Sequence, residues 1–280
     1  MRIIDTVPYF LYNFKSSIDF LRTYYSVYPD VFKEYFTYHC KDTEERHMES
    51  LKKYPKYIER IKEVHHNILP VIEETKEEYF KLFQISFPID VNLIVGGFGS
   101  NAYTHRQFIP DITFSLEKLS PKTEHLRTIV AHEFGHAAQN IMSEEAGIDW
   151  TKIQWKNPLT WLNQEGAATH FSRRTAINLN SSIYFSYNDE GEDWLAFSTR
   201  NRKEIKRAFS EDYSNLTDEL LFKKWFSING ENRFGYSRLG YFVGDMFFQH
   251  QIENLGEINA VIAWKEKGFE ESVKQWLFQN

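Results

Sequence analysis

The segment TIVAHEFGHAAQNIM, Thr128–Met142, contains an H-E-x-x-H sequence that begins at His132 and ends at His136. Residues four apart lie on the same face of an α-helix, so the two imidazoles would point towards one position, where they could bind zinc. Glu133 leaves the helix about 100° away from His132, beside such a metal rather than on it. There its carboxylate can accept a proton from a water. The motif therefore predicts a helix that carries two metal ligands and a general base.

The residues around the motif favour this helix. Ser120 can be the N-cap and Pro121 the first helical residue, which is a common helix start. Apolar residues then recur at helical spacing: Leu126, Ile129, Val130, Ala137 and Ile141. A helix with one buried face accounts for this spacing. The alternative interpretation is a pair of core histidines that are satisfied by hydrogen bonds.

A catalytic zinc site needs a third protein ligand and one open position. The continuation H-x-x-G-x-x-H is absent because position 142 is Met, and Cys40 is the single cysteine. Glu165 lies among apolar and small residues in LTWLNQEGAATHF, residues 159–171. Because burying a bare carboxylate is costly, Glu165 calls for a partner such as a metal. We therefore expect Glu165 to be the third ligand, on a helix that approaches the histidine helix closely.

The third ligand has alternatives that the sequence leaves open. Glu165 could be a surface residue. Three acidic residues compete with it: Glu144, Glu145 and Asp149. They follow the expected end of the histidine helix too closely to fold back easily.

Two tyrosines are candidates for stabilising the oxyanion of a tetrahedral intermediate. Tyr236 and Tyr241 lie in FGYSRLGYFVGDMFF, residues 234–248, with Gly240 and Gly244 around the second. Glycine is unfavourable in a helix unless something must come close. A neutral tyrosine hydroxyl donates a hydrogen bond at pH 7. Tyr241 is the first candidate and Tyr236 the second, and the alternative is two ordinary core tyrosines.

The rest of the chain predicts an α+β protein that is predominantly helical. Residues 16–85 favour helices that start at Ser16/Ser17, Asp30, Pro55 and Pro70. Within this region, the adjacent His65 and His66 are expected on the surface. Strands are expected at 89–95 and 111–116, and later helices from Pro158 and at 216–226, 236–249, 258–264 and 270–277. The change in composition near residue 86 suggests a helical N-terminal region, 1–85, and a catalytic domain, 86–280.

Bulk properties exclude several classes of partner. The net charge is −6 and no basic stripe is present, so a nucleic-acid partner is not expected. No run of 18 apolar residues predicts a membrane span. A single cysteine and an N-terminus without a clear signal peptide favour a cytoplasmic protein. Residues 97–102 fit G-x-G-x-x-A, but no helix is expected after them, so a glycine-rich turn is preferred to a dinucleotide site.

His132-Glu133-x-x-His136, followed some thirty residues later by Glu165, resembles the ligand order of the gluzincin metallopeptidases. Tyr241-x-x-Gly244 looks like the Y-x-x-G of the family M1 aminopeptidases, and Tyr236 lies where a second tyrosine occurs in one member. The short chain and the E-G-x-A sequence at Glu165 look closer to small bacterial predicted zinc-dependent proteases. The resemblance covers roughly residues 90–250. It implies a zincin-like domain with a small sheet beside the histidine helix, a zinc ion, and an oxyanion-stabilising tyrosine.

This sequence departs from those families in two places. The G-x-M-E-N signature of the M1 exopeptidases is missing, and GGFGSNAY stands roughly where it would fall. In thermolysin-type enzymes an acidic residue four after the glutamate ligand orients a histidine, and Thr169 occupies that position here. Endopeptidase and exopeptidase action therefore both stay open.

The sequence thus predicts a zinc-dependent peptidase that acts on a peptide or small protein. It does not indicate whether the chain is a monomer or an oligomer. We further expect residues 111–116 to form an edge strand that pairs with an extended substrate. Two other classes stay open. One is a zinc hydrolase for a non-peptide amide or ester, and the other is an inactive zinc-containing binding or regulatory protein.

Overall fold

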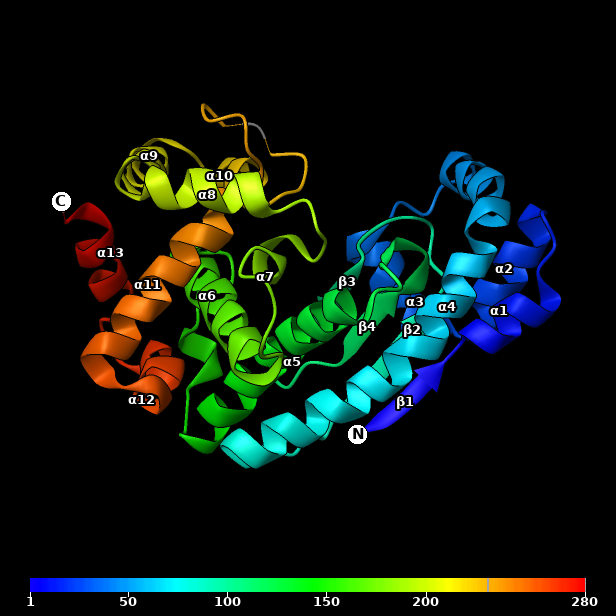
Figure 1. Cartoon of the computed structure of the whole chain (residues 1–280), viewed down its shortest axis with the longest axis horizontal. Helices are drawn as coiled ribbons and strands as arrows, with labels where there is room; N and C mark the ends of the chain where they lie inside the picture. The colour runs from blue at the N-terminus through cyan, green and yellow to red at the C-terminus, as the bar shows by residue number, and fades with distance from the viewer. Residues whose placement is uncertain (231, 280) are drawn as a thin grey trace. The chain divides into compact units, whose positions relative to one another are not determined.

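The computed structural model describes residues 1–230 and 232–279, which form an α+β protein that is mostly helical (Figure 1). By packing, the chain divides into two units, Met1–Glu133 and Phe134–Asn280. The boundary predicted near residue 86 lies inside the first unit. The reason is that the N-terminal residues supply a strand to the sheet that follows this boundary.

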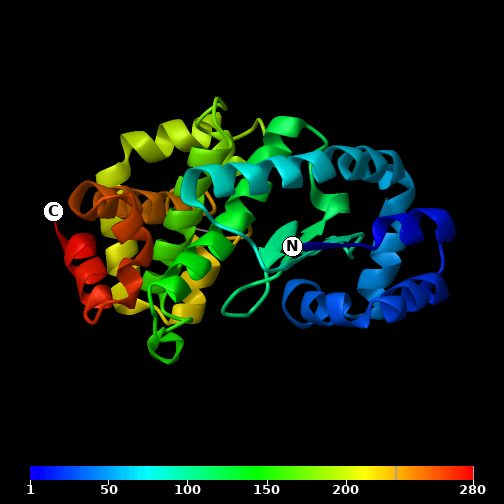
Figure 2. The ribbon, with the colours of Figure 1, turned by 90° about the horizontal axis from the view of Figure 1, so that it is seen from below.

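The sheet of the first unit has the strand order β1-β2-β4-β3. Its strands are β1 (Arg2–Asp5), β2 (Asp90–Ile94), β3 (Ala102–Thr104) and β4 (Ile112–Ser115). β1, β2 and β4 are parallel, and β3 pairs with β4 in the antiparallel direction. Figure 2 shows the N-terminus at this sheet. The predicted strands at 89–95 and 111–116 are confirmed, whereas β1 and β3 were not predicted.

The prediction that residues 111–116 form an edge strand is wrong. β4 is hydrogen-bonded to β2 on one side and to β3 on the other, and all its residues are buried. A substrate therefore cannot pair with it. Sequence pattern missed the covering strand because β3 has only three residues, too few to show an alternation of polar and apolar side chains.

The helices of the first unit precede and follow this sheet. Their bounds are α1 (Val7–Asn13), α2 (Ile18–Val27), α3 (Pro29–Glu34), the π-helix Tyr35–His39, α4 (Glu44–Phe83) and the 3₁₀ turn Leu116–Lys118. Ser17 caps α2, as predicted, by accepting a hydrogen bond from the amide of Phe20. Asp30 does not cap α3, because that helix already begins at Pro29.

The prediction that Pro55 and Pro70 begin new helices is wrong, since both lie inside α4, a single helix of 40 residues. An interior proline costs roughly 3 kcal/mol. α4 buries a stripe of side chains that includes Tyr54, Ile61, Val64, Ile68, Val71 and Ile72. Full burial of each such side chain contributes roughly 1.5–3 kcal/mol, so the stripe outweighs both prolines. His65 on this helix is half-buried, 2.6 Å from the Asp5 carboxylate, and not on the surface as expected.

The glycine-rich loop, residues 96–99, is held by two buried side chains. The amides of Gly96 and Phe98 donate to the Glu117 carboxylate at 2.9 and 3.0 Å. The two glycine amides that alternate with them donate to the Tyr35 hydroxyl at 2.7 and 3.1 Å. β3 follows the loop and no helix does, as expected. The amides that could hold a phosphate are therefore used within the protein.

Glu117 gives a prediction for stability against pH. Burial raises the pKa of its carboxyl from 4.5 to about 7, although the amides of the loop oppose the shift. Between these two values the folded protein binds the proton more tightly than the unfolded chain, so stability falls as pH rises through this window. Glu117→Gln should remove this contribution. The free energy of unfolding of the wild type minus that of the variant, measured by denaturant titration, should decrease from pH 4.5 to 7. A difference that stays constant over this range would contradict the assignment.

The second unit is helical in the part that the structure describes. Its helices are α6 (Pro158–Thr175), α7 (Ile183–Ser186), α8 (Glu192–Arg200), α9 (Arg202–Asn215), α10 (Asp218–Trp225), α11 (Leu239–Leu255), α12 (Glu257–Ile262) and α13 (Phe269–Phe278), with 3₁₀ turns at Trp150–Lys152 and Ala263–Lys265. The predicted start at Pro158 is confirmed, with Asn157 as the cap. α11 begins at Leu239, so Tyr236 precedes it.

α5 (Thr123–Glu145) contains the junction between the two units and carries the H-E-x-x-H sequence. It begins two residues after the predicted start. Ser120 and Pro121 form a turn before it, in which the Ser120 hydroxyl accepts from the amide of Lys122 at 3.3 Å and lies 2.8 Å from His125 Nδ1. The predicted helix is thus confirmed, and its first residue is not.

α6 and α11 lie side by side and meet at two glycines (Figure 1). A Cβ on Gly166 would be 2.3 Å from the Gly244 carbonyl oxygen, and a Cβ on Gly244 would be 2.6 Å from that of Leu162. Helix propensity alone would make Gly166→Ala stabilising by about 1 kcal/mol. Because the obstacle is backbone, we expect destabilisation by roughly 2–4 kcal/mol instead. Chemical denaturation measures the sign, and a stabilised variant would show that the helices are not this close.

Candidate metal centre

α5 presents His132 and His136 one helical turn apart, as the motif predicted. The His132 side chain is buried, and the His136 side chain is 13% exposed. Gly135, between them, lets α6 approach: a Cβ there would be 2.9 Å from the Cα of Ala168. The close approach expected from the small residues after Glu165 is therefore confirmed at this pair.

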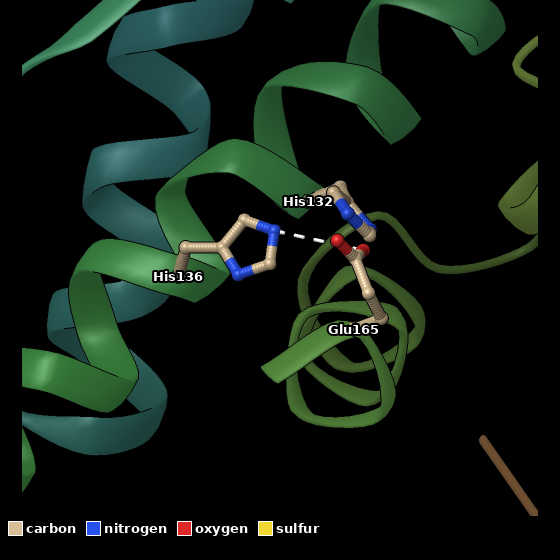
Figure 3. Close-up of side chains that lie close together, drawn as sticks. All are labelled: His132, His136 and Glu165. Atoms are coloured by element: carbon tan, nitrogen blue, oxygen red, sulfur yellow. Dashed lines mark ion pairs between the residues drawn. The ribbon is translucent and has the colours of Figure 1, made fainter. Parts of the chain in front are cut away.

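α6 presents Glu165 to the two histidines. One nitrogen of each imidazole and one carboxylate oxygen of Glu165 all lie within 4.8 Å of one another. His136 Nε2 and Glu165 Oε2 are 3.7 Å apart, and Figure 3 shows this pair beside the ring of His132. The chain thus brings together the three side chains that the sequence singled out as ligands.

The donor set fits zinc. Two imidazole nitrogens and one carboxylate oxygen form a common ligand set of catalytic zinc sites. With metal–ligand bonds of about 2.0–2.1 Å, ligand atoms on a tetrahedral ion lie about 3.3 Å apart, so the 3.7 Å between His136 Nε2 and Glu165 Oε2 is close to the separation that zinc requires. Burial raises the pKa of the Glu165 carboxyl, although His136 and Arg238 lower it. A divalent cation would add strongly to the stabilisation of the charged carboxylate.

The competing carboxylates have other partners. Glu144 accepts a hydrogen bond from the indole of Trp150. Asp149 caps a 3₁₀ turn and lies 2.8 Å from the ammonium of Lys152. Glu145 is exposed at the end of α5. None of the three belongs to the cluster of possible ligands among the described residues.

The two candidate tyrosines have different surroundings. Tyr241 lies in the first turn of α11, and its ring centroid is 4.2 Å from the guanidinium carbon of Arg238. The charge of Arg238 also lowers the pKa of Glu165, so Arg238 lies near both residues. Tyr236 precedes the helix and packs on Phe197, with ring centroids 4.6 Å apart. These contacts favour Tyr241 over Tyr236 as a residue of the centre, and both roles stay predictions.

Arg238 is the residue that sequence reasoning missed. Its backbone has φ of +60° in the left-handed region, and it is the N-cap of α11. Burial acts against its charge, but Tyr241, Tyr187 and Glu165 raise the pKa of the guanidinium. The signal in the sequence was a cationic residue three positions before Tyr241, a spacing that brings side chains together at a helix start.

Polar contacts join α6, which carries Glu165, to α11 and α12. Arg173 makes two hydrogen bonds to Asp245 of α11, at 2.5 and 2.7 Å. His170 and Arg174 both reach Glu257 of α12, at 2.7 and 2.9 Å. These contacts lie between one and three turns beyond Glu165 on the same helix, so they restrain the backbone that carries its carboxylate.

Thr169 stands where thermolysin-type enzymes have an acidic residue. It is fully buried, and its hydroxyl has no hydrogen-bond partner in the part of the chain that the structure describes. The expectation that the ligands are oriented from elsewhere stays open.

Comparisons with known protein families, with curated proteins and with solved structures found no match to this chain. Among the helices of the described residues, none combines the length and the apolar character that crossing a membrane requires. The functional interpretation therefore depends on the residues of the cluster and on the sequence motif.

Proposed function

We propose that this protein is a zinc-dependent peptidase with a zincin-like catalytic region. The observation that carries the proposal is the convergence of His132, His136 and Glu165, with Glu133 next to the first of them on α5. A purely structural zinc site has four protein ligands and no use for a carboxylate beside the metal. Three candidate ligands and an adjacent glutamate instead favour a site that activates water.

The residues of the chain have separate roles in the proposed reaction. When bound, zinc supplies a Lewis acid that polarises the scissile carbonyl and lowers the pKa of a water. His132, His136 and Glu165 would hold the ion. Glu133 accepts the proton of the attacking water and then donates it to the leaving amine. Tyr241, or Tyr236 as the second candidate, donates a hydrogen bond to the oxyanion of the tetrahedral intermediate.

Cleavage of a peptide library in the presence of zinc, with products identified by mass spectrometry, tests this function. We expect cleavage that stops when a chelator is added and returns with zinc. The positions of the cuts would distinguish endopeptidase from exopeptidase action. If no peptide is cleaved while zinc is bound, the peptidase is excluded. A parallel set of small ester and amide substrates would then separate a non-peptide hydrolase from a binding protein without turnover.

A further inference from the structure

Arg238 has an unusual setting beside the candidate metal centre. Its guanidinium carbon lies 4.2 Å from the ring centroid of Tyr241 and 5.1 Å from that of Tyr187. Arg238 and Tyr187 both have a left-handed backbone, with φ of +60° and +58°. This conformation costs roughly 1–3 kcal/mol at a residue other than glycine, and it persists where the surroundings enforce it. The arginine is therefore held in a defined place.

The charge of Arg238 is not neutralised by a carboxylate in contact with it. Within residues 1–230 and 232–279 no ion pair involves this guanidinium, and its side-chain hydrogen bond is to Tyr241. Two other arginines of the same unit differ: the partly buried Arg173 pairs with Asp245, and the exposed Arg174 pairs with Glu257. A guanidinium has five N–H donors, more than the hydrogen bond to Tyr241 uses.

The geometry points to Arg238 as the residue that binds a substrate carboxylate next to the metal centre, so that the preferred peptides carry an anionic group close to the bond that is cleaved. Guanidinium binds carboxylate through two parallel hydrogen bonds, and partial burial strengthens such a pair. The inference rests on the proposed function in one respect, that the ligand is a peptide. The carboxylate can be the C-terminus of the substrate or an acidic side chain, because both offer the same chemistry.

Equilibrium binding to the zinc-free protein tests this inference without turnover. The probes are three forms of N-acetyl-Phe-Ala-Leu-Ala: the free acid, the C-terminal amide, and the amide with glutamate in place of the first alanine. Isothermal titration calorimetry measures each Kd. We expect the free acid, the glutamate peptide, or both to bind about 10–100-fold more tightly than the plain amide. A preference for the free acid identifies the C-terminus as the source, and a preference for the glutamate peptide identifies a side chain.

Substitutions then assign the preference to this residue. Arg238→Gln should bind all three probes with the affinity of the plain amide. Arg238→Lys, which keeps the charge without the two-pronged geometry, should retain part of the preference. Arg233→Gln is the matched control, because Arg233 is exposed and pairs with Glu211 at 3.0 Å, and it should behave as wild type.

Three results would overturn the inference: equal wild-type affinity for the three probes, no binding of any of them, or an unchanged preference in a folded Arg238→Gln protein. These results are separate from a failure of the proposed function. If the protein prefers the carboxylate probes but cleaves no peptide, the anion site is supported and the proposed peptidase activity is excluded.

Discussion

Glu133→Gln should bind zinc as the wild type does and hydrolyse peptides about 10²–10⁴-fold more slowly. Glutamine has nearly the same shape as glutamate but cannot accept the proton of the attacking water. Glu133 also follows His132 on α5 and is not in the set of possible ligands, so its loss leaves the metal donors intact. The measurements are kcat/KM on one cleaved peptide and zinc content by mass spectrometry on the same samples.

Glu124→Gln is the matched control, since Glu124 is an exposed residue in the first turn of the same helix. It should leave both zinc content and kcat/KM unchanged. Near-normal turnover by Glu133→Gln would show that Glu133 is not the general base, even if zinc is bound.

Glu165→Ala should weaken zinc binding by at least about 100-fold. Loss of a group that only orients a metal ligand already costs up to about 100-fold in affinity, and loss of a ligand itself should cost more. The variant keeps both histidines but lacks the third donor, which α6 supplies. Because zinc that binds the folded state raises stability by mass action, added zinc should raise the melting temperature of the wild type and not that of the variant. Competition with a fluorescent chelator gives the affinity directly.

Glu145→Ala removes another glutamate, which is exposed at the end of α5, and should bind zinc as the wild type does. Wild-type affinity in Glu165→Ala would mean that another group supplies the third ligand.

The sequence predicted those parts of the centre that depend on local periodicity. The spacing of His132 and His136 requires only a helix, and the apolar surroundings of Glu165 already indicated that its carboxylate would be buried. The spacing of Arg238 from Tyr241 was a local signal for the first of its two tyrosine contacts. Its position also depends on a left-handed residue at the start of α11 and on Tyr187 from a distant part of the chain, and neither could be predicted from the sequence.

The wrong predictions about the fold also arise from long-range packing. Pro55 and Pro70 are local signals for a helix start, but the buried stripe of α4 is formed by tertiary packing and overrides them. The edge position assigned to residues 111–116 failed because strand neighbours are long-range properties. β1 comes from the first five residues and β3 from a three-residue segment, and neither shows a pattern that a sequence window can detect.

The most direct test of the metal centre is a crystal structure of the zinc-loaded protein with data collected on both sides of the zinc absorption edge. We expect one anomalous peak about 2.0–2.2 Å from a nitrogen of His132, a nitrogen of His136 and an oxygen of Glu165, with water in the fourth position. An anomalous peak elsewhere, or a fourth protein ligand that closes the site, would contradict the proposed catalytic zinc.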